Sequence, residues 1–426
     1  MSDYSANIGH KVHNIDNGKR LSILAQPALH FLVAFWVFCG SFVLIEPTPY
    51  ELSFFLILPV AIIARVGIHT RVFGLFFLLA LFTPFALIGV FQVSLVPQSE
   101  ALIYTIVTLF LFFTSYFVAN YVADAPHKNM KNIMRAWMAS ALIASLLGTL
   151  AYLKLIPGEE LFTLYGRAKG LFKDPNVFAP FLILPAMFAL QKILLGHFRK
   201  TIWSIIFIGI LFIGVFVSFS RGGWGAFLLA SILVFAFVFW FEANAKEKIR
   251  MMILAFIGGL GAVILLLGLL SIPAVGDLFS QRNQVVQEYD GGGEMGRFGR
   301  QGYAFEIAIE NPLGIGPFEF RETRIGEAPH NTYANIFHAY GWGGGLIFLI
   351  LIWLTLKKGI SVITKSSLNR TLMIPLIGTF IPLVIEAAII DIDHWRLFYL
   401  IVGLIWGVAA SSKITNLRGK NRPALI

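Results

Sequence analysis

Long apolar runs, separated by short polar segments, dominate the pattern of the chain. About twelve of them are long enough, or nearly so, to cross a bilayer as helices of roughly 20 residues. The runs cover approximately 26–45, 52–66, 72–92, 101–122, 133–153, 177–195, 201–219, 224–241, 251–271, 331–355, 371–390 and 395–411. We therefore expect an all-α polytopic membrane protein with about 12 transmembrane helices. The pattern shows no internal repeat, so residues 1–426 are expected to form a single integral membrane domain.

The polar segments complete this organisation. We expect a cytoplasmic N-terminal tail at 1–25, a large periplasmic loop at 272–329 between helices 9 and 10, and a cytoplasmic C-terminal tail at 412–426. Charged residues make up 13% of the chain, about half the share in soluble proteins. The single cysteine, Cys39, lies inside an apolar run, which excludes a disulfide framework or a thiolate metal site.

The basic residues set the expected orientation. If the N-terminus lies in the cytoplasm, about two thirds of the 33 Lys and Arg residues fall in inner segments, while most of the 23 acidic residues fall in outer ones. Both termini are then cytoplasmic. The net charge of +10 is explained by topology and by membrane lipids, so no nucleic-acid partner is expected.

The segment PHNTYANIFHAYGWGGG stands where the large loop meets the tenth apolar run. Pro329 ends the extended chain, and Asn331 is a plausible helix N-cap. His330 then lies at a helix mouth near the positive end of the dipole, which favours a neutral imidazole that can accept a proton. Asn335 and His338 continue a polar stripe along the helix. The alternative is a capped helix start whose histidine only makes a hydrogen bond.

Five arginines lie in outer segments, against the general charge bias. Guanidinium groups bind phosphate through two parallel hydrogen bonds and keep their charge, so several near the outer membrane surface suit a lipid-linked phosphate or pyrophosphate. The alternative is that each one extends to lipid headgroups or pairs with a nearby carboxylate. The five are Arg167, Arg221, Arg297, Arg300 and Arg396.

Two further segments carry candidate features. In the large loop, Phe305 and Ile309 predict a short amphipathic helix, either on the outer membrane surface or packed on the helix bundle. In DIDHWR, Asp391, Asp393 and His394 could bind a metal, but no second carboxylate cluster supports them. An ion pair between Asp393 and the arginine three residues later is the simpler interpretation. We expect a metal-independent site and no cofactor.

Several motifs resemble those of one family. His330-Asn331, nine residues, Gly341, two residues and Gly344 resemble the signature of the O-antigen ligase and O-antigen (exopolysaccharide) polymerase superfamily of bacterial inner-membrane glycosyltransferases. The similarity extends to GRAKGLFKDPNVFAP, SFSRGGWGAF and ENPLGIGPFEF. The segment DIDHWRLFYLIVGLIWG looks like the closing part of the exopolysaccharide-polymerase branch.

The resemblance implies a reaction and a location. The family transfers a glycan from undecaprenyl pyrophosphate to an acceptor sugar hydroxyl at the periplasmic face of the bacterial inner membrane, without a metal and with inversion. By motif, His330 would be the base or would orient the acceptor, and Arg221 with Arg297 or Arg300 would bind the pyrophosphate. The further candidates for substrate contacts are Arg167, Arg396, Asn331 and His394.

The resemblance leaves the acceptor open. A polymerase extends another lipid-linked repeat unit and has a chain-length regulator protein among its candidate partners, whereas a ligase transfers to a lipid A-core sugar. The DIDHWR segment favours the polymerase. A transporter or a lipid-linked oligosaccharide flippase is a more distant alternative, because internal repeats are absent and the long loop lies outside, between helices 9 and 10.

Overall fold

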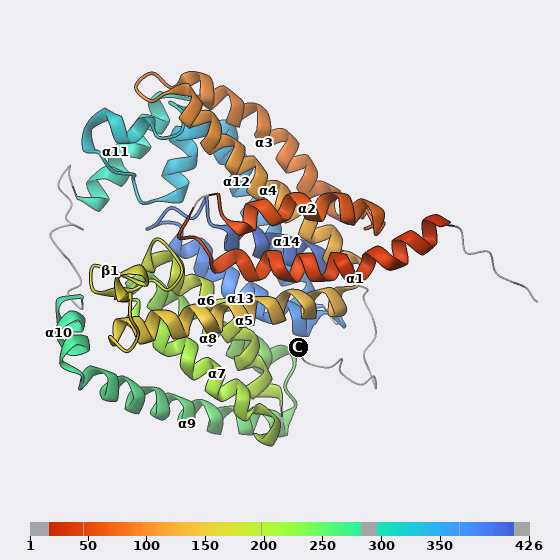
Figure 1. The fold of residues 1–426 in the computed structure, drawn as a ribbon, viewed down its shortest axis with the longest axis vertical. Helices are drawn as coiled ribbons and strands as arrows, with labels where there is room; N and C mark the ends of the chain where they lie inside the picture. The colour runs from red at the N-terminus through yellow and green to blue at the C-terminus, as the bar shows by residue number, and fades with distance from the viewer. Residues whose placement is uncertain (1–16, 46, 197, 283–295, 366, 413–426) are drawn as a thin grey trace, which may run out of the picture.

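The computed structural model describes residues 17–45, 47–196, 198–282, 296–365 and 367–412. These residues are almost entirely helical (Figure 1). The α-helices are α1 (Asn17–Phe38), α2 (Pro49–Ile63), α3 (Phe73–Gln92), α4 (Gln98–Asp124), α5 (Pro126–Tyr152), α6 (Pro175–Leu195), α7 (Phe198–Val217), α8 (Arg221–Phe241), α9 (Ala245–Leu270), α10 (Pro273–Arg282), α11 (Arg297–Glu310), α12 (Thr332–Thr364), α13 (Arg370–Glu386) and α14 (Arg396–Ala410). A hairpin of β1 (Thr163–Leu164) and β2 (Arg167–Ala168) interrupts the α5–α6 connection.

Each predicted apolar run corresponds to a helix in the described residues. Eight helices are long and apolar enough to span a membrane, and three further apolar helices are shorter. The protein is therefore a multi-pass membrane protein, while twelve crossings remain a prediction. The first helix begins at Asn17, ahead of its predicted start at 26, because the helix continues from the apolar run into the polar segment before it.

Polar caps define where several helices begin. Asp174 accepts a hydrogen bond from the backbone N–H of Asn176 at the start of α6, and Ser220 does the same for Gly223 at the start of α8. Asn244 and Glu247 form a reciprocal capping box at the start of α9. Such side chains satisfy backbone N–H groups that have no partner within the helix, so local sequence alone sets these boundaries.

The core lies around α6, α13 and α14, whose residues are buried along most of their lengths. α14 packs on α4, α13 packs on α8, and α12 packs on α3. By contrast, α9 runs along the edge of the bundle and buries only Met251 and Leu269 among its residues (Figure 1). An apolar helix exposed on most sides suits a lipid environment.

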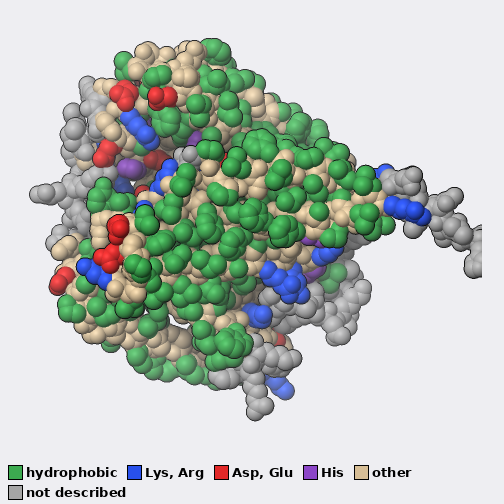
Figure 2. Space-filling view, viewed as in Figure 1, with side chains coloured by type: hydrophobic (Ala, Val, Ile, Leu, Met, Phe, Trp, Pro, Cys, Tyr) green, Lys and Arg blue, Asp and Glu red, His purple; other side chains and the backbone are tan. Residues whose placement is uncertain are grey.

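Polar side chains gather at the ends of the molecule. Figure 2 shows a wide apolar surface across the middle, with charged and histidine side chains towards the left and right. The left end of the same view carries α11, α10 and the β1–β2 hairpin (Figure 1). The predicted outer loops therefore lie at one end of the bundle.

The amphipathic helix predicted in the large loop is present as α11. Ala304, Ile307 and Ala308 are buried, and the helix packs against α12. Phe305 and Ile309 are 42% and 69% exposed. The predicted packing on the bundle is thus confirmed for one face, and a lipid contact of the exposed face remains a prediction. Residues 283–295 of the loop lie outside the described residues.

Candidate active site

The first turn of α12 is tied to the segment that follows α13. Asn331 caps the helix as predicted, because its Oδ1 accepts a hydrogen bond from the N–H of Ala334 (3.1 Å). Its Nδ2 donates to the carbonyl of Ala388 (3.0 Å). The N–H of Thr332 donates to the carbonyl of Ala387 (2.8 Å). The cap therefore joins two elements that are more than fifty residues apart in sequence.

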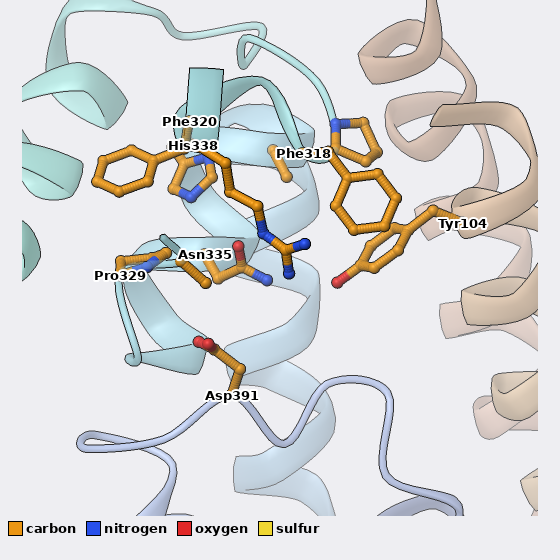
Figure 3. A pocket seen from close by; sticks show the side chains of 11 residues that line it. Tyr104, Phe318, Phe320, Pro329, Asn335, His338 and Asp391 are labelled. Atoms are coloured by element: carbon orange, nitrogen blue, oxygen red, sulfur yellow. The ribbon is translucent and has the colours of Figure 1, made fainter. Parts of the chain in front are cut away.

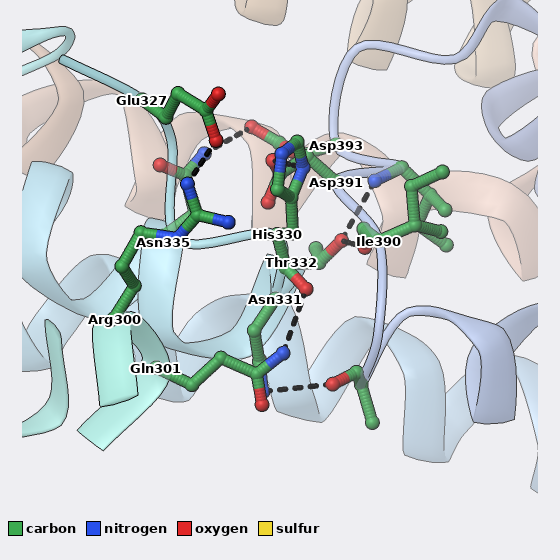
Figure 4. Close-up of polar contacts among 12 residues, drawn as sticks. Arg300, Gln301, Glu327, His330, Asn331, Thr332, Asn335, Ile390, Asp391 and Asp393 are labelled. Carbon is green, nitrogen blue, oxygen red and sulfur yellow. Dashed lines mark hydrogen bonds and ion pairs between the residues drawn. The ribbon is translucent and has the colours of Figure 1, made fainter. Parts of the chain in front are cut away.

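Three further hydrogen bonds hold the same turn (Figure 4). Thr332 Oγ1 donates to the carbonyl of Ile390 (2.8 Å) and accepts a hydrogen bond from the N–H of Ile392 (2.7 Å). Gln301 of α11 donates from Nε2 to the carbonyl of His330 (3.0 Å). Three elements thus fix the backbone around His330.

His330 has a strained backbone and a carboxylate partner. Its φ is +52°, in the left-handed region that residues other than glycine seldom adopt and that is common at functional sites. Its Nδ1 lies 3.4 Å from Oδ2 of Asp391, and its side chain is 30% exposed. The carboxylate thus lies beside one ring nitrogen, and the other ring nitrogen, Nε2, is not part of this contact. This geometry suits a general base.

The predicted ion pair between Asp393 and Arg396 is wrong. Asp393 Oδ2 instead accepts hydrogen bonds from Tyr104 Oη and Asn335 Nδ2, both at 2.9 Å. Arg396 donates from Nε to Oε1 of Glu51 (2.7 Å). The spacing of three residues brings side chains together only within one helix, and Asp393 lies in the turn before α14. The two side chains therefore enter different parts of the bundle.

The turn before α14 buries both of its central side chains. Burial, and secondly the charge of Asp391, raise the pKa of Asp393 to about 7. Burial, and secondly the charge of Arg396, lower the pKa of His394 to about 3. His394 Nε2 lies 2.6 Å from Thr108 Oγ1, and the ring stacks on Tyr104. The histidine is neutral at physiological pH, and a substrate contact through it remains a prediction.

The contacts of Arg167, Arg300 and Arg396 lie within the protein. Arg167 donates to the carbonyl of Ser218 and to Asn176 Oδ1, both at 2.8 Å, so it ties β2 to the segment before α8. Arg300 is 2% exposed and forms an ion pair with Glu327 (Figure 4). Arg396 pairs with Glu51, as described above. The alternative of pairing with carboxylates thus holds for Arg300 and Arg396.

Arg221 and Arg297 each begin a helix at the same end of the bundle. Next to Arg221, a Cβ placed on Gly222 would lie 2.5 Å from Oε1 of Glu386, the last residue of α13. The residues that follow Glu386 hold the first turn of α12. Arg221 therefore begins its helix beside the segment that positions His330.

A small cavity lies next to Asp391, the carboxylate partner of His330 (Figure 3). Its volume is about 40 Å³, enough for one or two water molecules. Asp391 and Pro329 line one side, and Asn335 and His338 extend from α12. His338 is almost fully buried, and its ring nitrogens have no hydrogen-bond partner among the described residues. The predicted polar stripe thus leads from His330 towards an internal polar space.

Sequence reasoning passed over two residues that line this cavity. Tyr104 comes from α4, and its ring lies edge-on to Phe318. Arg321 is exposed, and its guanidinium lies 4.8 Å from the centre of the Phe318 ring. Tyr104 and Thr108 form a polar pair one turn apart in an otherwise apolar run. This pair is the sequence feature that could have indicated a polar site on α4. Arg321 lies in a predicted outer segment, as do the five arginines chosen above.

Gly341 breaks α12 three residues after His338. Its φ of +70° and ψ of −177° interrupt α12, in a region that essentially only glycine occupies. A Cβ there would lie 2.4 Å from the carbonyl oxygen of Pro312. The loop after α11 fills the break, because the N–H of Trp342 donates to the carbonyl of Pro312 (2.9 Å) and the N–H of Ile315 to that of His338 (2.7 Å). This explains a glycine of the predicted signature.

Comparison with known proteins supports the predicted resemblance. Residues 206–349, about a third of the chain, match the family model described as O-antigen ligase. No curated protein matches the chain. The matched region contains Arg221, Arg297, Arg300 and His330, whereas Asp391 lies beyond it. Among the described residues, no group of three or more His, Cys, Asp or Glu side chains could hold a metal ion. Residues 206–349 are therefore an O-antigen ligase domain, and the protein is an enzyme of the membrane glycosyltransferase type.

Proposed function

We propose that the protein transfers a glycan from undecaprenyl pyrophosphate to a sugar hydroxyl of the acceptor, at the periplasmic face of the inner membrane. The observation that carries this proposal is the pair formed by His330 and Asp391, held by three elements at the mouth of α12. The matched family supports lipid-linked glycans as substrates.

The proposed reaction is a single displacement with inversion. The acceptor hydroxyl gives its proton to His330 Nε2 while its oxygen attacks the anomeric carbon of the donor sugar. The bond from that carbon to the pyrophosphate oxygen breaks, and undecaprenyl pyrophosphate leaves with the bonding electrons. Asp391 stabilises the imidazolium that results. General-base catalysis of this kind contributes roughly 10²–10⁴-fold, and no metal takes part.

Arginines are proposed to stabilise the charge that develops on the pyrophosphate. Arg221 begins α8, so the positive end of that helix adds to its charge. Arg321 adds a cation at the cavity beside Asp391. On α11 the candidates are Arg297 and Arg300, and Arg300 also pairs with Glu327. Fixed charges aimed at a leaving group account for a large share of catalysis in many enzymes.

Of the two acceptors, we propose a second lipid-linked repeat unit, which makes the protein a polymerase. The support is the likeness of Asp391–Gly407 to the closing segment of exopolysaccharide polymerases. Transfer to a lipid A-core sugar is the second candidate, and the description of the matched family favours it.

Purified protein in liposomes would test the proposal. With a synthetic undecaprenyl-pyrophosphate repeat unit alone, a polymerase yields a ladder of longer lipid-linked glycans without any ion gradient. A ligase yields product only when lipid A-core is added. Movement of the donor across the bilayer, with no new glycosidic bond under either condition, would support a flippase and overturn glycosyl transfer.

A further inference from the structure

A second, larger cavity lies at the other end of the bundle. Its volume is about 330 Å³, within the range of small-molecule sites. Tyr121 of α4 lines it, whereas Tyr104 of the same helix lines the cavity at the candidate active site. The two tyrosines are about 26 Å apart along the helix, close to the thickness of the hydrocarbon core. The larger cavity therefore belongs to the opposite membrane face, which the charge pattern assigns to the cytoplasm.

The wall of this cavity is cationic. Arg65 and Lys128 line it, both exposed, and no ion pair in the described part of the chain involves either. Asp124 also lines it, but its carboxylate accepts hydrogen bonds from His69 Nε2 (2.7 Å) and from the N–H of Gly67 (3.1 Å). The cavity wall thus carries two basic side chains against one carboxylate and keeps an excess of positive charge.

His30 and Asn129 add polar side chains to the wall of this cavity. Tyr121 Oη accepts a hydrogen bond from Asn132 Nδ2 (3.3 Å) and lies 2.6 Å from His30 Nδ1. Either Tyr121 Oη or His30 Nδ1 can donate this hydrogen bond, according to the tautomer of the histidine. Neither His30 Nε2 nor Asn129 Oδ1 has a hydrogen-bond partner among the described residues, and Asn129 is 3% exposed.

Arg65 also occupies an unusual backbone position. Its φ is +57°, and the N–H of Val66 donates to the carbonyl of Ala61 (3.0 Å), which closes the end of α2. Glycine usually occupies this left-handed position, because it has no Cβ to strain the backbone. An arginine at this position has a Cβ that strains the backbone, but its guanidinium lies at the cavity.

We propose that this cavity binds the phosphate of an anionic phospholipid from the cytoplasmic leaflet. The exposed side chains of Arg65 and Lys128 supply donors for the phosphate oxygens. Ile62 and Leu24, both largely exposed on α2 and α1, provide an apolar surface for the acyl chains. Basic pockets between helices on this side of a membrane suit such headgroups.

Thermal unfolding of the full-length protein in detergent would test the site. Short-chain phosphatidylglycerol is expected to raise the melting temperature, while phosphatidylcholine of the same chain length is not. Glycerol phosphate, which has the same phosphate group but no acyl chains, is tested in parallel. If it stabilises the protein as well as the lipid does, the site takes a free phosphate compound and the lipid assignment is wrong.

Three variants distinguish lipid binding in the cavity from a general attraction of anionic lipid to basic residues. Arg65→Gly and Lys128→Gln should each weaken phosphatidylglycerol binding about fivefold, since one basic residue near a membrane contributes about that much. Arg65→Gly relieves the backbone, so the lipid-free protein should unfold at no lower temperature. Lys131→Gln removes an exposed charge from the same helix as Lys128 but outside the cavity, and should bind normally. Equal losses in all three variants would overturn the proposal.

Discussion

At the residue scale, the candidate chemistry depends on His330 and the carboxylate beside it. If His330 takes the acceptor proton, His330→Ala should lower kcat by roughly 10²–10⁴-fold while leaving the melting temperature nearly unchanged, because the side chain is partly exposed at a helix mouth. Asp391→Asn should lower kcat less, since the ring stays in place but loses its counter-charge.

Transfer from a synthetic undecaprenyl-pyrophosphate glycan would measure both variants. His69→Ala is a matched control, because His69 also pairs with an aspartate, Asp124, which ends α4 far from the candidate active site. Full turnover by His330→Ala would place the base elsewhere. Wild-type activity in His330→Gln, with a flat pH profile near neutrality, would reduce its role to orienting the acceptor.

Arg221 tests the proposed pyrophosphate contact. Arg221→Lys keeps the charge but loses the planar fork that holds two phosphate oxygens, so kcat/KM for the donor should fall at least tenfold while the protein still folds. Arg71→Lys, at the predicted cytoplasmic end, should retain activity, because the hydrogen bonds of Arg71 within the described residues go to backbone carbonyls. Equal activity of the two variants would exclude a bidentate phosphate contact at Arg221.

Asp393 should make the stability of the protein depend on pH. Its folded pKa of about 7 lies above its unfolded value, so its neutral form is stabilising in acid and this contribution is lost as the pH rises towards and through 7. Asp393→Asn keeps an oxygen for Tyr104 and Asn335 but cannot ionise. The melting temperature of the variant minus that of the wild type should therefore increase from pH 5 to pH 8. Parallel curves would contradict the raised pKa.

At the scale of elements, the break in α12 decides how the outer loop is seated. Gly341→Ala would force a Cβ against Pro312 in a backbone conformation that alanine cannot adopt without strain of about 1–3 kcal/mol. The yield and melting temperature of folded protein should both fall. Gly225→Ala is the control, because a Cβ there meets nothing within 4 Å and alanine favours a helix. Equal stability of the two variants would show that α12 can continue without the break.

At the scale of the whole molecule, the predicted orientation can be tested with single cysteines. Cys39 is the only cysteine of the sequence and is buried, so a Cys39→Ser background carries no native thiol. A membrane-impermeant maleimide added to intact spheroplasts should label Glu160→Cys and Glu306→Cys but not Lys246→Cys, and all three after lysis. Labelling of Lys246→Cys in intact cells would invert the topology and remove the proposed periplasmic site.

The sequence by itself determined which segments form the membrane helices and the caps at several of their starts. A run of apolar residues can satisfy its backbone only by hydrogen bonds within the same segment, so hydrophobicity located every predicted membrane helix in the described residues. The cap at Asn331 and the amphipathic α11 are equally local, since neighbours within four residues decide both. The matched family model confirmed the resemblance that the His330 motif indicated.

Only the tertiary structure decided which side chains meet. Asp391 faces His330 from across the bundle, and Arg396 pairs with Glu51, which is 345 positions away in sequence. The same packing buries Asp393 between Tyr104 and Asn335, where sequence spacing had assigned it to Arg396. Periodicity carries information over a few residues, because it reflects one helix at a time. Partners contributed by different helices depend on how those helices pack, and no local pattern records that arrangement.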